Sequence, residues 1–280
     1  MREHWFQVDD HCTVYGREHG DPEGRWIVAL HGLTRNADDF DTLAPHLPPG
    51  WRMLALDLRG RGRSTYDPDW RNYVPLTYVR DVRVVLQQAG IERCVFLGTS
   101  LGGLLTLMIG AVTPHVLAGA ILNDIGCVID PRGLSRIQAY TGTLPPVTNW
   151  DEAREQVKTV YGTTLPDLDD ADFDVLARRS FAEDEDGIPQ LRFDPEIGRA
   201  IRELDMSLGD LWAHLEAIRD VPVLLLRGAE SDILNFQTAE AMAHQHPDLE
   251  WIEVAGRGHV PLLNESSCVS AIARFLGKLK

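Results

Sequence analysis

The sequence has no long apolar run: none of its 280 residues falls in a window of about 18 consecutive apolar residues. Its first residues, MREHWFQVDD, lack the apolar core and cleavage site of a secretory signal. Basic residues are in the minority, and the net charge of −15 leaves little room for the basic patch that phosphate binding needs. We therefore expect neither a membrane nor a nucleic acid as a partner.

Cysteine is also scarce. The four cysteines, Cys12, Cys94, Cys127 and Cys268, are widely scattered and form no CxxC pair. Disulfide frameworks belong to short secreted chains, so this pattern favours reduced thiols in a cytoplasmic protein. Histidine, cysteine and aspartate nowhere cluster at metal-ligand spacing, and no metal site is predicted.

What the sequence does contain is an alternation of short apolar runs with helical patterns. Strands are predicted at 25–32, 51–60, 94–98, 117–125, 222–232 and 249–256, and an edge hairpin within 4–19. Helices are predicted at 38–47, 78–90, 101–112, 238–246 and 267–279. The central strands are apolar on both faces, as a parallel sheet covered by helices requires. The fold class is therefore α/β, with a mostly parallel sheet and helices on both faces.

The alternation stops between residues 127 and 213. This stretch has no long β-branched run and is predicted to form several helices separated by proline and glycine. Its acidic runs, DLDDADFD and AEDEDG, are typical of a solvated surface. We expect a core formed by 1–126 and 214–280, interrupted by a helical insertion at 127–213.

The sequence GTSLG, residues 98–102, lies where a predicted strand turns into a helix. A serine on such an elbow has a strained backbone, and its neighbours two positions away must be small. Gly98 and Gly102 meet that requirement. The elbow would expose the Ser100 hydroxyl as a nucleophile, and the Leu101 amide at the helix N-terminus could stabilise a developing oxyanion.

A serine nucleophile needs a base and a carboxylate that orients it. His259 follows the last predicted strand, at the carboxyl edge of the sheet where ligands bind in open α/β folds. His214, where the insertion rejoins the core, is a weaker alternative. Asp232, in the loop GAESDIL that follows the strand residues PVLLLRG, is the predicted acid.

Two other carboxylates compete with Asp232. Glu230 lies two residues before it. Asp124 is the stronger rival, because it ends the 117–125 strand and points to the same edge of the sheet; it could instead be a turn carboxylate that anchors the insertion.

The loop after the 25–32 strand, HGLTRNADDF, is predicted to supply the second oxyanion donor. Gly32 lets the backbone approach the substrate closely, and Leu33 presents its amide. His31 precedes the loop and is expected to be structural.

Taken together, LHGLTRN, DLRGRGRS, GTSLGG, RGAESDIL and GRGHVPLL resemble the α/β-hydrolase superfamily, and within it the cap-bearing serine hydrolases. The resemblance covers about 20–126 and 214–280. It implies an eight-stranded sheet, a lid formed by 127–213, no cofactor, and attack by Ser100 on an acyl carbonyl with His259 moving the proton. It also implies that DLRGRGRS is structural. A serine at the elbow excludes the branches that need a carboxylate nucleophile there.

The predicted function is hydrolysis of a small carboxylic ester or lactone. An alternative is a carbon–carbon bond hydrolase acting on ring-cleavage diketones, for which Arg35 is the one candidate anchor; a ligand sensor of the same fold is a third. The partner is a small-molecule substrate, and the sequence leaves monomer and dimer open. Residues expected to line the pocket are Gly32, Arg35, Tyr140, Trp150, Phe181 and Val260.

Overall fold

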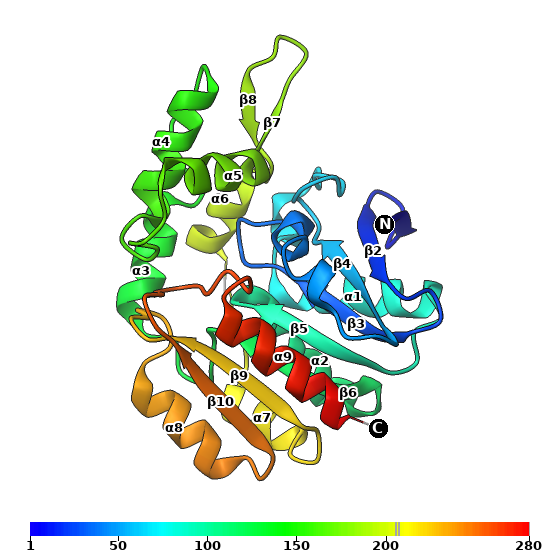
Figure 1. Cartoon of the computed structure of the whole chain (residues 1–280). Helices are drawn as coiled ribbons and strands as arrows, with labels where there is room; N and C mark the ends of the chain where they lie inside the picture. Colours follow the sequence, from blue (N-terminus) through cyan, green and yellow to red (C-terminus); the bar gives the residue numbers. More distant parts are fainter. Residues whose placement is uncertain (205, 207, 280) are drawn as a thin grey trace.

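The computed structural model describes residues 1–204, 206 and 208–279. Its centre is an eight-stranded sheet in the order β1-β2-β4-β3-β5-β6-β9-β10 (Figure 1). The strands are β1 (Arg2–Gln7), β2 (Thr13–Gly20), β3 (Arg25–Leu30), β4 (Trp51–Asp57), β5 (Cys94–Thr99), β6 (Leu117–Asn123), β9 (Val223–Gly228) and β10 (Leu249–Val254). The β1–β2 and β2–β4 pairs are antiparallel and the other pairs are parallel. The predicted fold class is confirmed.

Helices cover both faces of the sheet because its central strands are apolar on both faces. On one face, Val28 and Leu30 pack with α1 (Pro75–Gln88), α2 (Leu101–Val112), α7 (Leu211–Ala217) and α8 (Phe236–Gln245). On the other, Ile27 and Ala29 pack with α9 (Ser266–Lys278). Successive strand residues thus enter opposite layers, as the period of two requires.

The predicted helix at 38–47 is wrong. This segment forms two short 3-10 turns, Ala37–Phe40 and Ala44–His46. Asn36 caps the first turn, and the second contains Pro45, which has no N–H to donate to a continuing helix. Phe40 and Leu43 still pack into the core on the α9 side of the sheet.

Residues between β6 and α7 form a layer above the carboxyl edge of the sheet (Figure 1). We call this layer the cap; its helices are α3 (Pro131–Tyr140), α4 (Trp150–Tyr161), α5 (Asp170–Ser180) and α6 (Glu196–Glu203). It has its own apolar cluster, including Val157, Phe173 and Leu176. The division of the chain at 127 and 213 stays a prediction.

The cap also contains a hairpin, β7 (Phe181–Glu183) with β8 (Pro189–Leu191), where only helices were predicted. The acidic run AEDEDG covers the end of β7 and most of the turn that follows it. The Asp184 carboxylate accepts hydrogen bonds from the amides of Asp186 and Ile188, and Gly187 adopts a φ of 77°. The run is exposed to solvent, as predicted, although it lies in a hairpin and not among helices.

No helix in the described part of the chain is long and apolar enough to cross a membrane.

Candidate active site

Ser100 occupies the sharp turn between β5 and α2. Its φ is 51° and its ψ is −113°, a conformation that L-residues rarely adopt. The glycines on either side make the turn possible: a Cβ on Gly98 would lie 2.4 Å from the Gly102 carbonyl, and a Cβ on Gly102 would lie 2.0 Å from the Leu30 oxygen. The Ser100 amide is fixed by the Asn123 carbonyl at 3.0 Å. The strained turn is therefore built into the core.

His259 lies beside this serine, on the loop that follows β10. Its Nε2 is 2.8 Å from Ser100 Oγ, and its Nδ1 is 2.8 Å from Asp124 Oδ2. A carboxylate can only accept, so Nδ1 carries the proton and Nε2 is left to accept from the serine hydroxyl. Serine, histidine and aspartate thus form a continuous hydrogen-bonded chain, the arrangement in which a base activates a nucleophile.

Asp124 is fully buried, directly after β6, with a φ of 57°. Besides His259, its carboxylate accepts from the Gly228 amide at 2.8 Å and from the Ser231 hydroxyl at 2.6 Å. Strand β6 pairs with both β5 and β9, so Ser100, Asp124 and the loop after Gly228 meet at one edge of the sheet. Three donors satisfy a carboxylate that would be costly to bury unpaired.

The prediction that Asp232 orients His259 is wrong. The Asp232 carboxylate instead accepts from Arg136 of the cap, with distances of 2.6 Å to Nε and 2.9 Å to Nη2. Burial works to raise the pKa of Asp232, but the hydrogen bonds and charge of Arg136 outweigh it and hold that pKa below its ordinary value. The rival Asp124 has the position that was assigned to Asp232.

The two predicted oxyanion donors flank the serine. A Cβ on Gly32 would lie 3.8 Å from Ser100 Cβ, which places the 31–35 loop against the nucleophile. Among the described residues, no acceptor is bound to the amide of Leu33 or that of Leu101. The Leu33 carbonyl accepts from Arg61 Nε at 2.9 Å, which fixes the loop. Both amides are thus available to a ligand oxygen beside Ser100.

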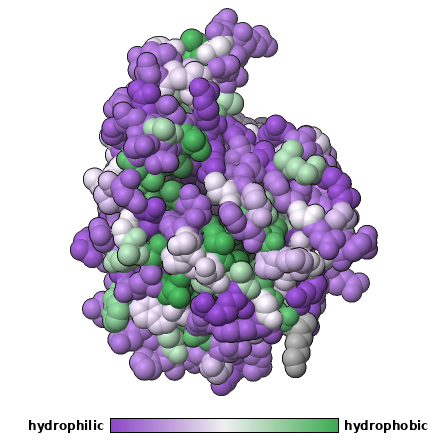
Figure 2. All heavy atoms as spheres, viewed as in Figure 1, coloured by the Kyte–Doolittle hydropathy of each residue, from purple (hydrophilic) through white to green (hydrophobic). Residues whose placement is uncertain are grey.

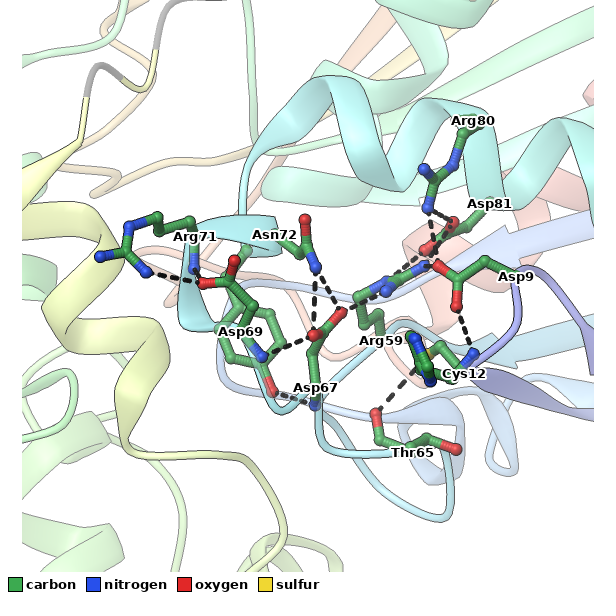
Figure 3. A network of polar contacts seen from close by, with 12 residues as sticks. Asp9, Cys12, Arg59, Thr65, Asp67, Asp69, Arg71, Asn72, Arg80 and Asp81 are labelled. Carbon is green, nitrogen blue, oxygen red and sulfur yellow. Dashed lines mark hydrogen bonds and ion pairs between the residues drawn. The ribbon is translucent and has the colours of Figure 1, made fainter.

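Residues 57–64, DLRGRGRS, contact this loop: Arg61 binds the Leu33 carbonyl, and the Leu58 amide donates to His31. The side chain of Arg59 is completely buried and binds the carboxylates of Asp9, Asp67 and Asp81 (Figure 3). The Asp57 carboxylate accepts from the amides of Ala37 and Arg63 at 2.7 Å, and burial raises the pKa of Asp57 to about 6. Arg59 thus joins three segments through side-chain ion pairs, and Asp57 holds the backbone at Ala37 and Arg63.

His31 is placed as a structural residue. Its Nε2 accepts from the Leu58 amide at 2.9 Å, so its Nδ1 is protonated and donates to the Gly32 carbonyl at 2.6 Å. Burial, aided by the nearby Arg61 charge, lowers the pKa of His31 to about 3. His214, the other alternative base, lies against the Leu208 carbonyl and not against Ser100.

Two cavities open at Ser100. The first, which we call the polar chamber, is narrow, with a free volume of about 70 Å3. It is lined by Ser100 and His259, by the charged and hydroxyl side chains of Thr34, Arg35, Asp39, Arg136, Tyr140 and Tyr161, and by aliphatic side chains such as Leu165, Leu176 and Leu262. The second, the apolar chamber, has a free volume of about 430 Å3 and is lined mainly by aliphatic residues such as Leu101, Leu104, Ile125, Leu134 and Ile201.

Of the residues predicted to line the pocket, Gly32, Arg35, Tyr140 and Val260 border the polar chamber. Trp150 and Phe181 do not. The Trp150 indole donates to Glu183 on the hairpin, and Phe181 is packed in the apolar cluster of the cap. Sequence reasoning missed Arg136, Tyr161 and Ile137, because nothing in a helical pattern tells which face of a cap helix meets the core.

In the described residues there is no group of three or more histidine, cysteine, aspartate or glutamate side chains that could hold a metal ion. The groups that can act chemically at this site are Ser100, His259, Asp124 and the backbone amides of Leu33 and Leu101.

Comparison with known proteins agrees with the α/β fold. A crystal structure of an alpha/beta hydrolase from Novosphingobium aromaticivorans is 36% identical, covers 99% of this chain and 98% of its own, and superposes with a TM-score of 0.92. The 3-hydroxybutyrate-oligomer hydrolase of Cupriavidus necator is 30% identical over 95% of this chain and 92% of its own length. A serine hydrolase-like protein of Danio rerio is 26% identical over 94% and 83%. The sequence model of the alpha/beta hydrolase family matches residues 27–271, and the chain belongs to that family.

Proposed function

We propose that this hydrolase cleaves a small carboxylic ester or lactone through an acyl-enzyme on Ser100. The observation that carries the proposal is the hydrogen-bonded chain from Ser100 Oγ through His259 to Asp124, with both distances at 2.8 Å. Family membership makes the chain a hydrolase, and the geometry supports acyl transfer as its reaction class.

The proposed reaction has two halves. His259 Nε2 takes the hydroxyl proton as Ser100 Oγ bonds to the acyl carbon, and the Leu33 and Leu101 amides stabilise the oxyanion. The imidazolium then donates its proton to the leaving alkoxide, and Asp124 stabilises the charge on the ring meanwhile. A water, deprotonated by the same nitrogen, releases the acid from the serine.

Two further observations favour an ester over the carbon–carbon bond alternative. Arg35, the candidate anchor for an enolate, is engaged by Asp39 in the same cavity. The relative named 3-hydroxybutyrate-oligomer hydrolase also supports an ester bond, because hydroxy acids oligomerise through carboxylic esters.

The test is hydrolysis of 4-nitrophenyl acetate and butyrate by the wild-type protein and by Ser100→Ala. We expect the variant to lose roughly a thousandfold or more in kcat, because no other group can form the acyl-enzyme. Ser270→Ala, an exposed serine on α9, is the matched control and should keep wild-type activity. Activity that survives Ser100→Ala would overturn the assignment of the nucleophile.

A further inference from the structure

The polar chamber contains charged side chains that the apolar chamber lacks, and an ester bound at Ser100 can extend into both chambers. Leu33, Ser100 and Ile137 line the polar chamber as well as the apolar chamber, so the chambers adjoin at the nucleophile. An acyl carbon bonded to Ser100 Oγ has two substituents to place, the acyl chain and the leaving alcohol. Each chamber can therefore take one half of the substrate.

The position of His259 decides which half lies where. The protonated imidazole must give its proton to the leaving oxygen, which therefore lies within hydrogen-bond reach of Nε2. His259 lines the polar chamber and is not among the residues around the apolar chamber. The alcohol half consequently occupies the polar chamber, and the acyl half occupies the apolar one.

Arg136 offers the polar chamber an unused cationic donor. Its Nε and Nη2 bind Asp232, which does not line the chamber. Its Nη1 donates to no other group in the described residues. The side chain is 26% exposed and borders the chamber, so the free N–H groups of Nη1 are accessible to a ligand.

Arg35, the other guanidinium of the polar chamber, is already occupied. Its Nε and Nη2 bind Asp39 at 2.9 and 2.5 Å, and its Nη1 donates to the Ser180 hydroxyl at 2.5 Å. Asp39 itself lines the chamber, so an anion beside Arg35 would meet a carboxylate. An anionic group on the alcohol half is therefore recognised best at Arg136.

We propose that the substrates are esters of hydroxy acids: the alcohol half carries a carboxylate that binds Arg136 Nη1, and the acyl half is an apolar chain. This inference rests on the proposed ester hydrolysis at Ser100. Water adds across the acyl carbon–oxygen bond, and the products are an apolar carboxylic acid and a hydroxy carboxylate. A carboxylate bound to a guanidinium forms a hydrogen-bonded ion pair, in which donor and acceptor are both charged, and a neutral alcohol half cannot form that pair.

The experiment compares 3-(butanoyloxy)butanoate with its isosteric primary amide, 3-(butanoyloxy)butanamide, by measuring butyrate release. We expect wild-type kcat/KM to be roughly tenfold or more higher for the carboxylate, mainly through a lower KM. Arg136→Gln should abolish this preference by lowering kcat/KM for the carboxylate to about the value for the amide. The amide thus reports whether the catalytic chain is intact.

Asp232→Asn is the matched control, since it breaks the same ion pair and keeps the guanidinium. It should retain or increase the preference for the carboxylate. Two outcomes would show that the pair only tethers the cap and would overturn the anchor. One is that Arg136→Gln lowers kcat/KM equally on both substrates. The other is that Asp232→Asn loses the preference for the carboxylate as Arg136→Gln does. A wild-type protein without preference overturns it as well. Failure of the ester chemistry is recognised separately, because Ser100→Ala would then match wild type on both substrates.

Discussion

At the scale of single residues, we expect substitution of Asp124 to lower kcat strongly and substitution of Asp232 to leave kcat nearly unchanged. Asp124→Asn removes the charge that fixes the His259 tautomer and stabilises the imidazolium, and we expect kcat for 4-nitrophenyl butyrate to fall by roughly 10^4-fold. Asp232→Asn leaves the hydrogen bonds of His259 untouched, and kcat should stay within about threefold of wild type. Steady-state kinetics on the two purified variants checks both values.

Circular dichroism is the control, because Asp124 is buried and its loss could unfold the protein. A folded Asp124→Asn with wild-type kcat, or an Asp232→Asn with a thousandfold loss, would contradict the assignment of the acid.

The choice between these two carboxylates illustrates what the sequence could not determine. Both follow strands that end at the same edge of the sheet, so their spacing along the chain is equally suitable. Which one meets His259 is decided by Ser231, whose hydroxyl bonds to Asp124, and by Arg136, which arrives from a cap helix to hold Asp232. These contacts join residues about a hundred positions apart, and no local pattern encodes them.

Because His31 is buried in its neutral form, we expect it to lower the free energy of unfolding as the pH falls. Its pKa is about 3 in the folded protein, against about 6.5 for an unperturbed histidine. Between these values the unfolded chain binds one more proton than the folded chain, so stability falls as pH drops through this window. We expect the free energy of unfolding of wild type to fall by about 1.4 kcal/mol more per pH unit than that of His31→Gln.

Urea unfolding between pH 4 and 6.5 measures this difference. Asp57 works in the opposite direction, since its pKa is raised to about 6 and the folded state holds its proton longer. It is present in both proteins, so subtracting the two slopes isolates His31. Parallel pH profiles would show that His31 is not buried in its neutral form.

At the scale of elements, the turn between β5 and α2 tolerates no side chain at its glycines. A Cβ on Gly98 would lie 2.4 Å from backbone atoms of Gly102 and Gly103, which cannot move away as a flexible side chain could. We expect Gly98→Ala to lower the free energy of unfolding by about 3 kcal/mol or more, or to prevent recovery of folded protein. Thermal unfolding measures the loss.

Gly277→Ala is the matched control. Gly277 lies in α9, and nothing stands within 4 Å of the Cβ that alanine would add. Alanine there should be neutral or stabilise by up to about 1 kcal/mol. A melting temperature of Gly98→Ala equal to that of wild type would contradict the steric account of the elbow.

This turn was predictable because its cause is local. A serine between two glycines at a strand-to-helix junction carries the information within a few residues, and so does the apolar alternation that predicts the strands. The cap hairpin was not predictable in the same way. Its strands are three residues each, too short for a periodic signal, and its acidic turn resembles any solvated segment.

At the scale of the whole molecule, the cap and the core are held together around the site. The Gly258 amide donates to the Thr164 carbonyl at 2.7 Å, and Arg257 binds Asp167 of the cap. Both contacts come from the loop that carries His259.

The face shown in Figure 2 is largely hydrophilic, with hydrophobic residues in small groups. The apolar surface beside the nucleophile is that of the apolar chamber, whose lining includes Ser100.

The apolar chamber predicts how activity depends on acyl chain length. Each methylene buried there contributes about 0.8 kcal/mol, so kcat/KM should rise about fourfold per carbon along a series of 4-nitrophenyl esters until the chamber is full. Ile201→Trp fills part of the chamber from the cap helix α6. We expect it to shift the optimum at least two carbons shorter while hydrolysis of the acetate changes less than about twofold. Glu203→Trp places the same bulk on an exposed position of that helix and should keep the wild-type profile. Identical chain-length profiles for the two tryptophan variants would show that the acyl chain lies elsewhere, because only one of the two substitutions reaches the chamber.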